Sequence, residues 1–104
     1  MSRTVSSFIE ATLLLLPPDA GGRASAVAPR EGSYRPFAWI ADRLTRIRLL
    51  EGPPRLAPGE EARVVLEVEE EIDMHRGEEL RVVELDDRVV GIATILRVCR
   101  AATV

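Results

Sequence analysis

Hydrophobic and polar residues alternate along several short stretches of this chain, which is the pattern of β-strands with one buried face. The first such stretch covers residues 7–16, where Glu10 and Thr12 mark the polar face. Its apolar face carries Ile9, Ala11, Leu13 and Leu15. We therefore predict a strand here, ended by the Pro17-Pro18 pair that follows.

The clearest strand pattern lies at residues 62–72. Its inward face is predicted to carry Val64, Leu66, Val68 and Ile72, and its outward face Arg63, Glu67, Glu69 and Glu71. A helical period would instead bring Glu67 and Glu71 onto the same face as Val64 and Val68. A strand separates the charged and apolar residues better than a helix does.

Four further strands are predicted around these two. Residues 34–40 form a short aromatic segment that Pro36 would place at an edge or a bulge. Residues 43–50 set Arg46 and Arg48 against Ile47 and Leu49, and residues 80–85 and 88–98 form a hairpin around Asp86-Asp87. A long loop is predicted over residues 17–32, and a turn rich in Gly and Pro over residues 52–60. Six short strands with such connections predict an all-β barrel or sandwich, and we favour one compact barrel.

Composition places this barrel in a soluble setting. The chain has 104 residues, 46% of them hydrophobic and 30% charged, which suits one globular domain over residues 1–104. The longest apolar run, Leu13–Leu16, is far shorter than the ~20 residues of a membrane-spanning helix, and no secretory signal is visible. The lone Cys99 excludes an internal disulfide and a cysteine-based zinc site. We expect a cytoplasmic protein.

Charge is spread unevenly along the chain. Residues 1–59 hold eight Arg against five acidic residues, or +3, and residues 60–104 hold six Arg against twelve, or −6, which gives the net −3. Nucleic-acid-binding domains are usually basic, because contacts with phosphate supply most of their nonspecific affinity. A basic patch is therefore expected only in the first half.

Five short motifs give the chain a resemblance to a known family. In sequence order they are Phe8-Ile9-Glu10-Ala11, Gly21-Gly22-Arg23, Tyr34-Arg35-Pro36-Phe37, Pro58-Gly59-Glu60 and Val89-Val90-Gly91. Together they resemble the C-terminal barrel of translation elongation factor Tu over about residues 5–98, which leaves short, flexible ends. The residues expected to matter for this structure are Gly21, Gly22, Tyr34, Arg35, Pro36, Pro58, Gly59 and Gly91.

The resemblance implies a six-stranded antiparallel Greek-key barrel. In the family this domain packs on a GTPase domain and a middle barrel, and it helps to hold the T-arm of aminoacyl-tRNA. No GTPase activity is implied for this chain, because it has no lysine and therefore no phosphate-binding loop ending in Lys-Ser or Lys-Thr.

No other catalytic arrangement emerges from the sequence. His75 falls in a predicted turn, where a histidine is more often solvated than a general base, and Ser25 has no histidine near it in sequence. Glu67, Glu69 and Glu71 are better explained as the solvated face of a strand than as a pair of catalytic carboxylates. We expect no enzyme activity, no cofactor and no metal.

RNA binding is one functional hypothesis. Arg23 matches the arginine that contacts the tRNA backbone in the family, and its guanidinium suits a phosphate contact. Alternatively, Arg23 points to water or pairs with an acidic residue of this chain. Glu70, Asp86 and Asp87 add negative charge where RNA would approach, so tRNA binding is disfavoured.

A stand-alone module that binds a protein partner is the favoured hypothesis. Leu14, Leu16 and Val65 lie opposite the inward faces of their strands, and Tyr34, Phe37 and Trp39 are either core or loop anchors or interface residues. The basic residues Arg43, Arg46 and Arg48 are either a solvated face or a surface for an acidic partner, including the glutamate strand of a second copy.

Overall fold

Six strands and two short 3₁₀ turns account for the regular structure of the chain. The computed structural model describes residues 7–70, 73–84 and 87–100. The strands are β1 (Ser7–Leu15), β2 (Phe37–Ile40), β3 (Arg43–Glu51), β4 (Glu61–Val68), β5 (Glu79–Val83) and β6 (Val89–Arg100). The 3₁₀ turns are η1 (Pro18–Ala20) and η2 (Pro29–Glu31).

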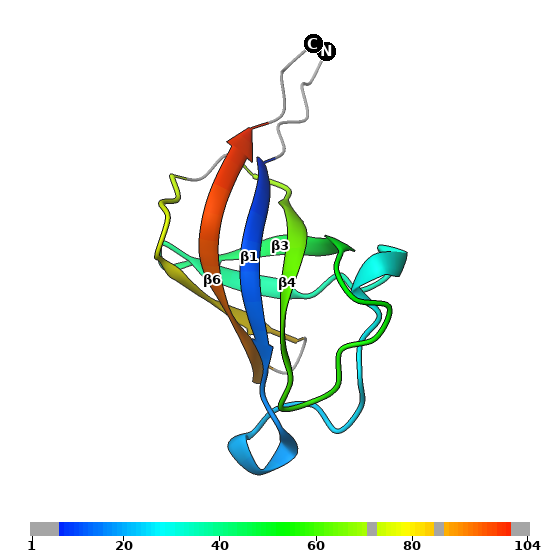
Figure 1. Cartoon of the computed structure of the whole chain (residues 1–104). Helices are drawn as coiled ribbons and strands as arrows, with labels where there is room; N and C mark the ends of the chain where they lie inside the picture. Colours follow the sequence, from blue (N-terminus) through cyan, green and yellow to red (C-terminus); the bar gives the residue numbers. More distant parts are fainter. Residues whose placement is uncertain (1–6, 71–72, 85–86, 101–104) are drawn as a thin grey trace.

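The six strands close into an antiparallel barrel in the order β1-β4-β3-β2-β5-β6. β1 lies between β4 and β6 (Figure 1), and it pairs with β6 from Ser7↔Arg100 to Leu15↔Gly91. The prediction of an all-β fold with six strands in one barrel is therefore confirmed. Since closure gives every strand two neighbours, the sheet has no free edge along its paired residues.

Local irregularities in the strand pairing help the sheet to curve. The register shifts between Glu10 and Ala11 where β1 meets β6, and again between Leu49 and Glu51 where β3 meets β4. An extra residue on one strand bends that strand and increases its twist, which is how short sheets close into barrels. The bulge in β3 leaves Leu50 half-buried on the outer surface.

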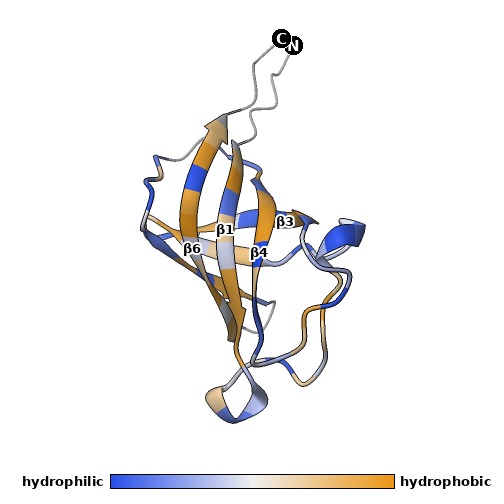
Figure 2. Cartoon of the chain, in the orientation of Figure 1, coloured by the Kyte–Doolittle hydropathy of each residue, from blue (hydrophilic) through white to orange (hydrophobic). Residues whose placement is uncertain are grey.

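The barrel interior is filled by alternate residues of every strand. Figure 2 shows hydrophobic residues along β1, β4 and β6, and the residues that face inward are almost entirely inaccessible to solvent. The predicted inward sets are confirmed for β1 (Ile9, Ala11, Leu13 and Leu15), for β3 (Ile47 and Leu49) and for β4 (Val64, Leu66 and Val68). The core is completed by residues such as Ile40, Leu80, Val82, Val90, Ala93 and Ile95.

Two predicted strands are shorter in the structure. The segment 34–40 becomes a strand only from Phe37, because Pro36 has no N–H to donate to a strand ladder. The carbonyls of Tyr34 and Pro36 nevertheless accept hydrogen bonds from the N–H groups of Leu49 and Ile47. The strand predicted over residues 62–72 ends at Val68, followed by a bend at Glu69 and Glu70, while residues 71 and 72 lie outside the described part of the chain.

The predicted hairpin after residue 79 is confirmed in its paired strands, β5 and β6. The turn between them closes where the N–H of Glu84 donates to the carbonyl of Arg88, and Leu85 and Asp86 lie outside the described residues.

The long loop before β2 is held to the loop before β4 by a bridge between Val27 and Leu56, both buried. Neither 3₁₀ turn in the described ranges is long or apolar enough to cross a membrane.

Candidate binding surface

The loop after β1 is a tight turn that only glycine can complete. Gly21 has φ +85°, in the left-handed region, and the N–H of Gly22 donates to the carbonyl of Pro17. A Cβ placed on Gly22 would lie 2.0 Å from the carbonyl oxygen of Leu16. This close approach fixes the position at which Arg23 leaves the loop.

Arg23 is directed at another part of its own chain. Its guanidinium forms an ion pair with the carboxylate of Glu84, the residue that follows β5. It also donates to the carbonyl oxygen of Ser25 at 3.1 Å and to the hydroxyl of Ser25 at 3.0 Å. The guanidinium carbon lies 5.2 Å from the centre of the Tyr34 ring. Of the two alternatives for Arg23, the structure therefore shows pairing with an acidic residue of the same chain.

Glu84 is the centre of this cluster. Its Oε2 atom accepts the hydrogen bond of the Tyr34 hydroxyl at 2.7 Å as well as the contact from Arg23, and its Oε1 lies 3.7 Å from the Arg88 guanidinium. Burial raises the pKa of Tyr34, and the hydrogen bond to Glu84 and its negative charge raise it further. Burial lowers the pKa of Arg23, but Glu84 outweighs that effect and leaves this pKa raised. The cluster therefore favours a charged Arg23 beside a neutral Tyr34.

The basic residues of β3 face glutamates of the neighbouring strand β4 and of the bend that follows it. Arg48 donates to Glu67 at 3.0 Å, Arg43 lies 3.2 Å from Glu70, and Arg46 lies 3.9 Å from Glu69. The antiparallel register of β3 and β4 sets Arg48 directly opposite Glu67, and Glu69 and Glu70 follow in the bend after β4. The acidic surface that these arginines meet in the structure thus belongs to the same chain.

A groove opens where β2 and β5 separate. Their pairing ends at Phe37↔Val83, and beyond it a groove of about 480 Å³ lies between the segment before β2 and the turn after β5. It is lined by Tyr34, Arg35, Pro36, Phe37, Arg46, Glu84 and Arg88. Arg46 and Phe37 contact each other in the groove lining, with the guanidinium carbon of Arg46 5.1 Å from the centre of the Phe37 ring. All four residues of the Tyr34-Arg35-Pro36-Phe37 motif are thereby placed at the groove.

Two large apolar side chains stand exposed beside this groove. Trp39 is 40% exposed and Leu44 is 45% exposed, and they face each other across the β2–β3 hairpin. They lie on the same outer face as Phe37 and Arg46, which form the next cross-strand pair on that face. We call Phe37, Trp39, Leu44 and Arg46 the outer hairpin face.

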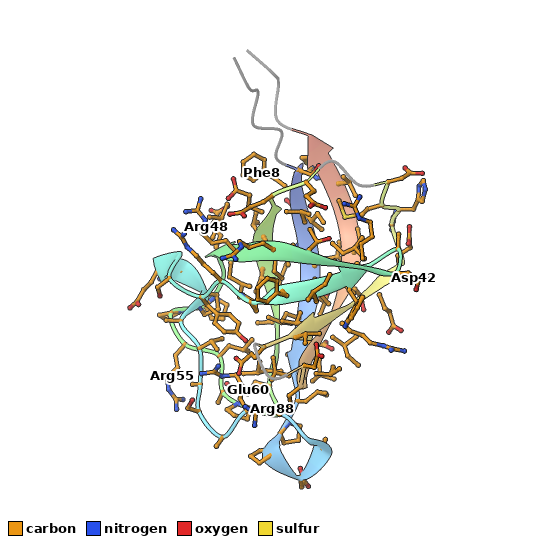
Figure 3. All side chains as sticks on the ribbon, turned by 180° about the vertical axis from the view of Figure 1, so that it is seen from behind. Phe8, Asp42, Arg48, Arg55, Glu60 and Arg88 are labelled. Carbon is orange, nitrogen blue, oxygen red and sulfur yellow. The ribbon has the colours of Figure 1, made fainter. Side chains whose placement is uncertain are left out.

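The turn of this hairpin has an unusual backbone. Ala41 has φ +49° and Asp42 has φ +63°, so two residues with side chains occupy the left-handed region. Asp42 lies at the far end of β3 from Arg48 (Figure 3). Such two-residue turns are usually made by Gly together with Asn or Asp, because few other residues adopt positive φ without strain.

The other predicted outer residues are less accessible. Leu14, Leu16 and Val65 are each half-buried, and Val65 lines a shallow hollow of about 300 Å³ together with Phe8, Leu50 and the exposed Cys99.

Two further motif positions have structural roles. The Gly59 N–H donates to the carbonyl of Leu15 at 2.7 Å in the turn after Pro58, and buried Gly91 lets β6 approach Leu13 and Leu14 of β1.

The residues considered for catalysis do not come together in the described part of the chain. His75 is exposed in the turn before β5, with Nε2 3.3 Å from Asp73, and Ser25 contacts Arg23. Glu67 and Glu69 face Arg48 and Arg46, and Glu71 lies outside the described residues. Within the described ranges, no three His, Cys, Asp or Glu residues converge as a metal-binding group.

Sequence reasoning missed the role of Glu84, since it stands alone between a strand and a turn and no spacing marks it. It also missed the pairing of the arginines with glutamates of the same chain. This pairing could have been inferred from the opposite charges of residues 43–48 and 67–70, because successive strands are often neighbours in an antiparallel sheet.

Comparison with known proteins adds no further constraint. The chain matches no protein-family model, and no curated protein matches it.

Proposed function

We propose that this chain is a non-catalytic binding module, similar to the C-terminal barrel of elongation factor Tu, that engages a protein partner through its outer hairpin face. The observation that carries the proposal is the exposed cross-strand pair of Trp39 and Leu44. Trp, Tyr and Arg dominate the binding energy of protein interfaces, and an exposed tryptophan next to an exposed leucine leaves apolar area for a partner to cover.

The strand order supports the Greek-key part of the proposal. The consecutive strands β2, β3 and β4 are neighbours, and β1 reaches its place beside β4 through the long loop over residues 16–36. Three neighbouring strands joined in sequence, with a fourth connected by a long loop and lying beside the outer one, are the pattern of a Greek key.

The surroundings of Arg23 favour a protein partner over RNA. Its guanidinium is engaged with Glu84 and Ser25, so a phosphate would have to displace contacts within the chain. Arg48 likewise faces Glu67 of β4, and Arg43 faces Glu70 in the bend after it. The same pairing weakens the charge argument for self-association, because the glutamates offered to a second copy already have partners.

Site-specific photo-crosslinking tests the proposal. A photoreactive amino acid replaces Leu44 in the full chain, and a control chain carries it at Glu61, an exposed position on β4. Both are exposed to an extract of the natural source, and crosslinked products are identified by mass spectrometry. We expect one defined protein to be crosslinked from position 44 and not from position 61, with a lower yield when Trp39→Ser is added.

A parallel titration separates the protein hypothesis from the RNA hypothesis. Fluorescence anisotropy with aminoacyl-tRNA is measured at increasing salt, since phosphate contacts give a steep salt dependence. Tight, salt-sensitive tRNA binding, together with equal crosslinking from positions 44 and 61, would overturn the proposal. Circular dichroism of each variant verifies that the barrel remains folded.

A further inference from the structure

The groove beside the outer hairpin face is basic, although the chain as a whole is acidic. Three arginines line it, Arg35, Arg46 and Arg88, against one carboxylate, Glu84. The chain has a formal net charge of −3. Glu84 is also occupied, since Arg23 and the Tyr34 hydroxyl both contact its Oε2 atom. The groove therefore presents positive charge to anything that enters it.

Two of these arginines offer hydrogen-bond donors. Arg35 is exposed and makes no hydrogen bond or ion pair with any residue in the described ranges. The Arg46 guanidinium donates no hydrogen bond within those ranges, and its distance of 3.9 Å from Glu69 is too long for one. The guanidinium carbon lies 5.1 Å from the centre of the Phe37 ring, so a cation–π contact holds the group at the groove without using its hydrogen-bond donors.

We propose that this groove binds the carboxylates of an acidic segment of the protein partner, with Arg35 and Arg46 as the donors. This inference rests on the proposed function and specifies the chemistry of the partner. A guanidinium held over an aromatic ring donates two parallel hydrogen bonds to a carboxylate without a large loss of side-chain freedom. Tyr34 and Phe37 supply the apolar wall against which the segment's other side chains pack.

The charges around the groove favour a short acidic segment over a nucleic acid. On one side of the groove, the β3 arginines are paired with Glu67, Glu69 and Glu70. On the other side, the exposed Asp87 is next to Arg88 in sequence. A nucleic acid carries charge along its whole length, so its phosphates would extend from the groove over these acidic residues. A few carboxylates on a peptide fit within the basic groove alone.

The test uses a short fluorescein-labelled peptide of alternating Glu and Ala, and the same peptide with Gln in place of Glu. Anisotropy is measured with the full chain, with Arg35→Glu/Arg46→Glu and with Arg46→Lys. The matched control is Arg76→Glu, which reverses an exposed arginine in the turn before β5. A single-stranded RNA oligonucleotide and inorganic phosphate are titrated in the same way.

We expect the Glu peptide to bind and the Gln peptide to bind at least about tenfold more weakly, because a hydrogen bond to a charged group contributes that much or more. The double charge reversal should abolish binding, Arg46→Lys should weaken it by about tenfold because the planar fork is lost, and Arg76→Glu should change it less than about twofold. Chemical-shift changes of the Arg35 and Phe37 amides locate the peptide.

Three results would overturn the inference. They are equal binding of the Glu and Gln peptides, equal loss in Arg76→Glu and in the groove variant, and binding of RNA or phosphate without the Glu peptide. Failure of the inference is distinct from failure of the proposed function. If a partner is crosslinked from position 44 and the Arg35→Glu/Arg46→Glu variant still binds it, the proposed function stands. The inference that the partner binds through an acidic segment is then wrong.

Discussion

The carboxylate of Glu84 joins Arg23, from the loop after β1, to the turn that follows β5. Sixty-one residues separate the two in sequence, so this ion pair ties together two parts of the barrel that no strand pairing connects. The contact is partly buried, with the two side chains 22% and 20% exposed, and Tyr34 shares it. Its loss therefore leaves the Tyr34 hydroxyl without this acceptor and Arg23 with only its contacts to Ser25.

Glu84→Ala should lower the free energy of unfolding by about 1–3 kcal/mol, the usual cost of leaving partly buried polar groups unsatisfied. Urea denaturation followed by circular dichroism measures this change. Glu79→Ala removes an exposed carboxylate from β5 and should stay within about 0.5 kcal/mol of the wild type. Equal effects of the two substitutions would show that Glu84 does not stabilise the fold.

Tyr34 should titrate well above the ordinary tyrosine value, because burial and Glu84 raise its pKa. Above pH ~10 the unfolded chain has lost the phenolic proton while the folded chain still binds it, so stability falls as the pH rises. Below pH ~10 both states keep the proton and this group adds no pH dependence. The chain has one tyrosine and no lysine, so tyrosinate absorbance reports this group directly.

The absorbance titration needs two comparisons. In urea the same residue should titrate near pH ~10, as in any unfolded chain. Glu84→Gln removes the neighbouring negative charge and should move the folded-state midpoint downward. A folded wild type that titrates at the same pH as the urea-unfolded chain would contradict the prediction.

Replacing Ala41-Asp42 by Asn-Gly should stabilise the chain by about 1 kcal/mol, since both positions have positive φ and these residues suit such a turn. Thermal unfolding should show a higher Tm. Ala24→Asn serves as the control because Ala24 is exposed and has no positive φ. If both variants shift Tm equally, the turn conformation is not the cause.

Gly22→Ala should be far more damaging than Gly21→Ala. A Cβ at position 22 would overlap the Leu16 carbonyl oxygen at 2.0 Å, whereas position 21 has open space and only the cost of its φ of +85°. We expect a loss of about 3 kcal/mol for Gly22→Ala and about 1 kcal/mol for Gly21→Ala. Chemical denaturation of the two variants side by side measures the difference.

The alternation of residues 7–16 and 43–50 was enough to predict which side chains fill the barrel, because a period of two leaves one choice of inward face. The ends of strands were harder. β4 ends at Val68, before a bend, although every second residue in the sequence is acidic as far as Glu71. Solvated charged residues show the same sequence pattern inside a strand and after its end, so the pattern does not locate that end.

The sequence predicted some residues of the binding surface but not the contacts between them. Arg46 and Phe37 were both singled out, but their contact depends on a cross-strand register that a single sequence does not specify. The destination of Arg23 depends on a loop conformation and on Glu84, far away in the chain. Contacts of this kind arise from tertiary packing, and local patterning has no access to them.

Pairing between β1 and β6 also determines when the barrel can form during synthesis. Of the six strands β1 is made first, yet one of its two neighbours, β6, is completed only at Arg100. Until then the buried row from Ile9 to Leu15 has one side unpaired, and contacts between such distant segments are slow to form. A nascent chain must therefore keep this apolar strand from wrong partners until β6 has been made.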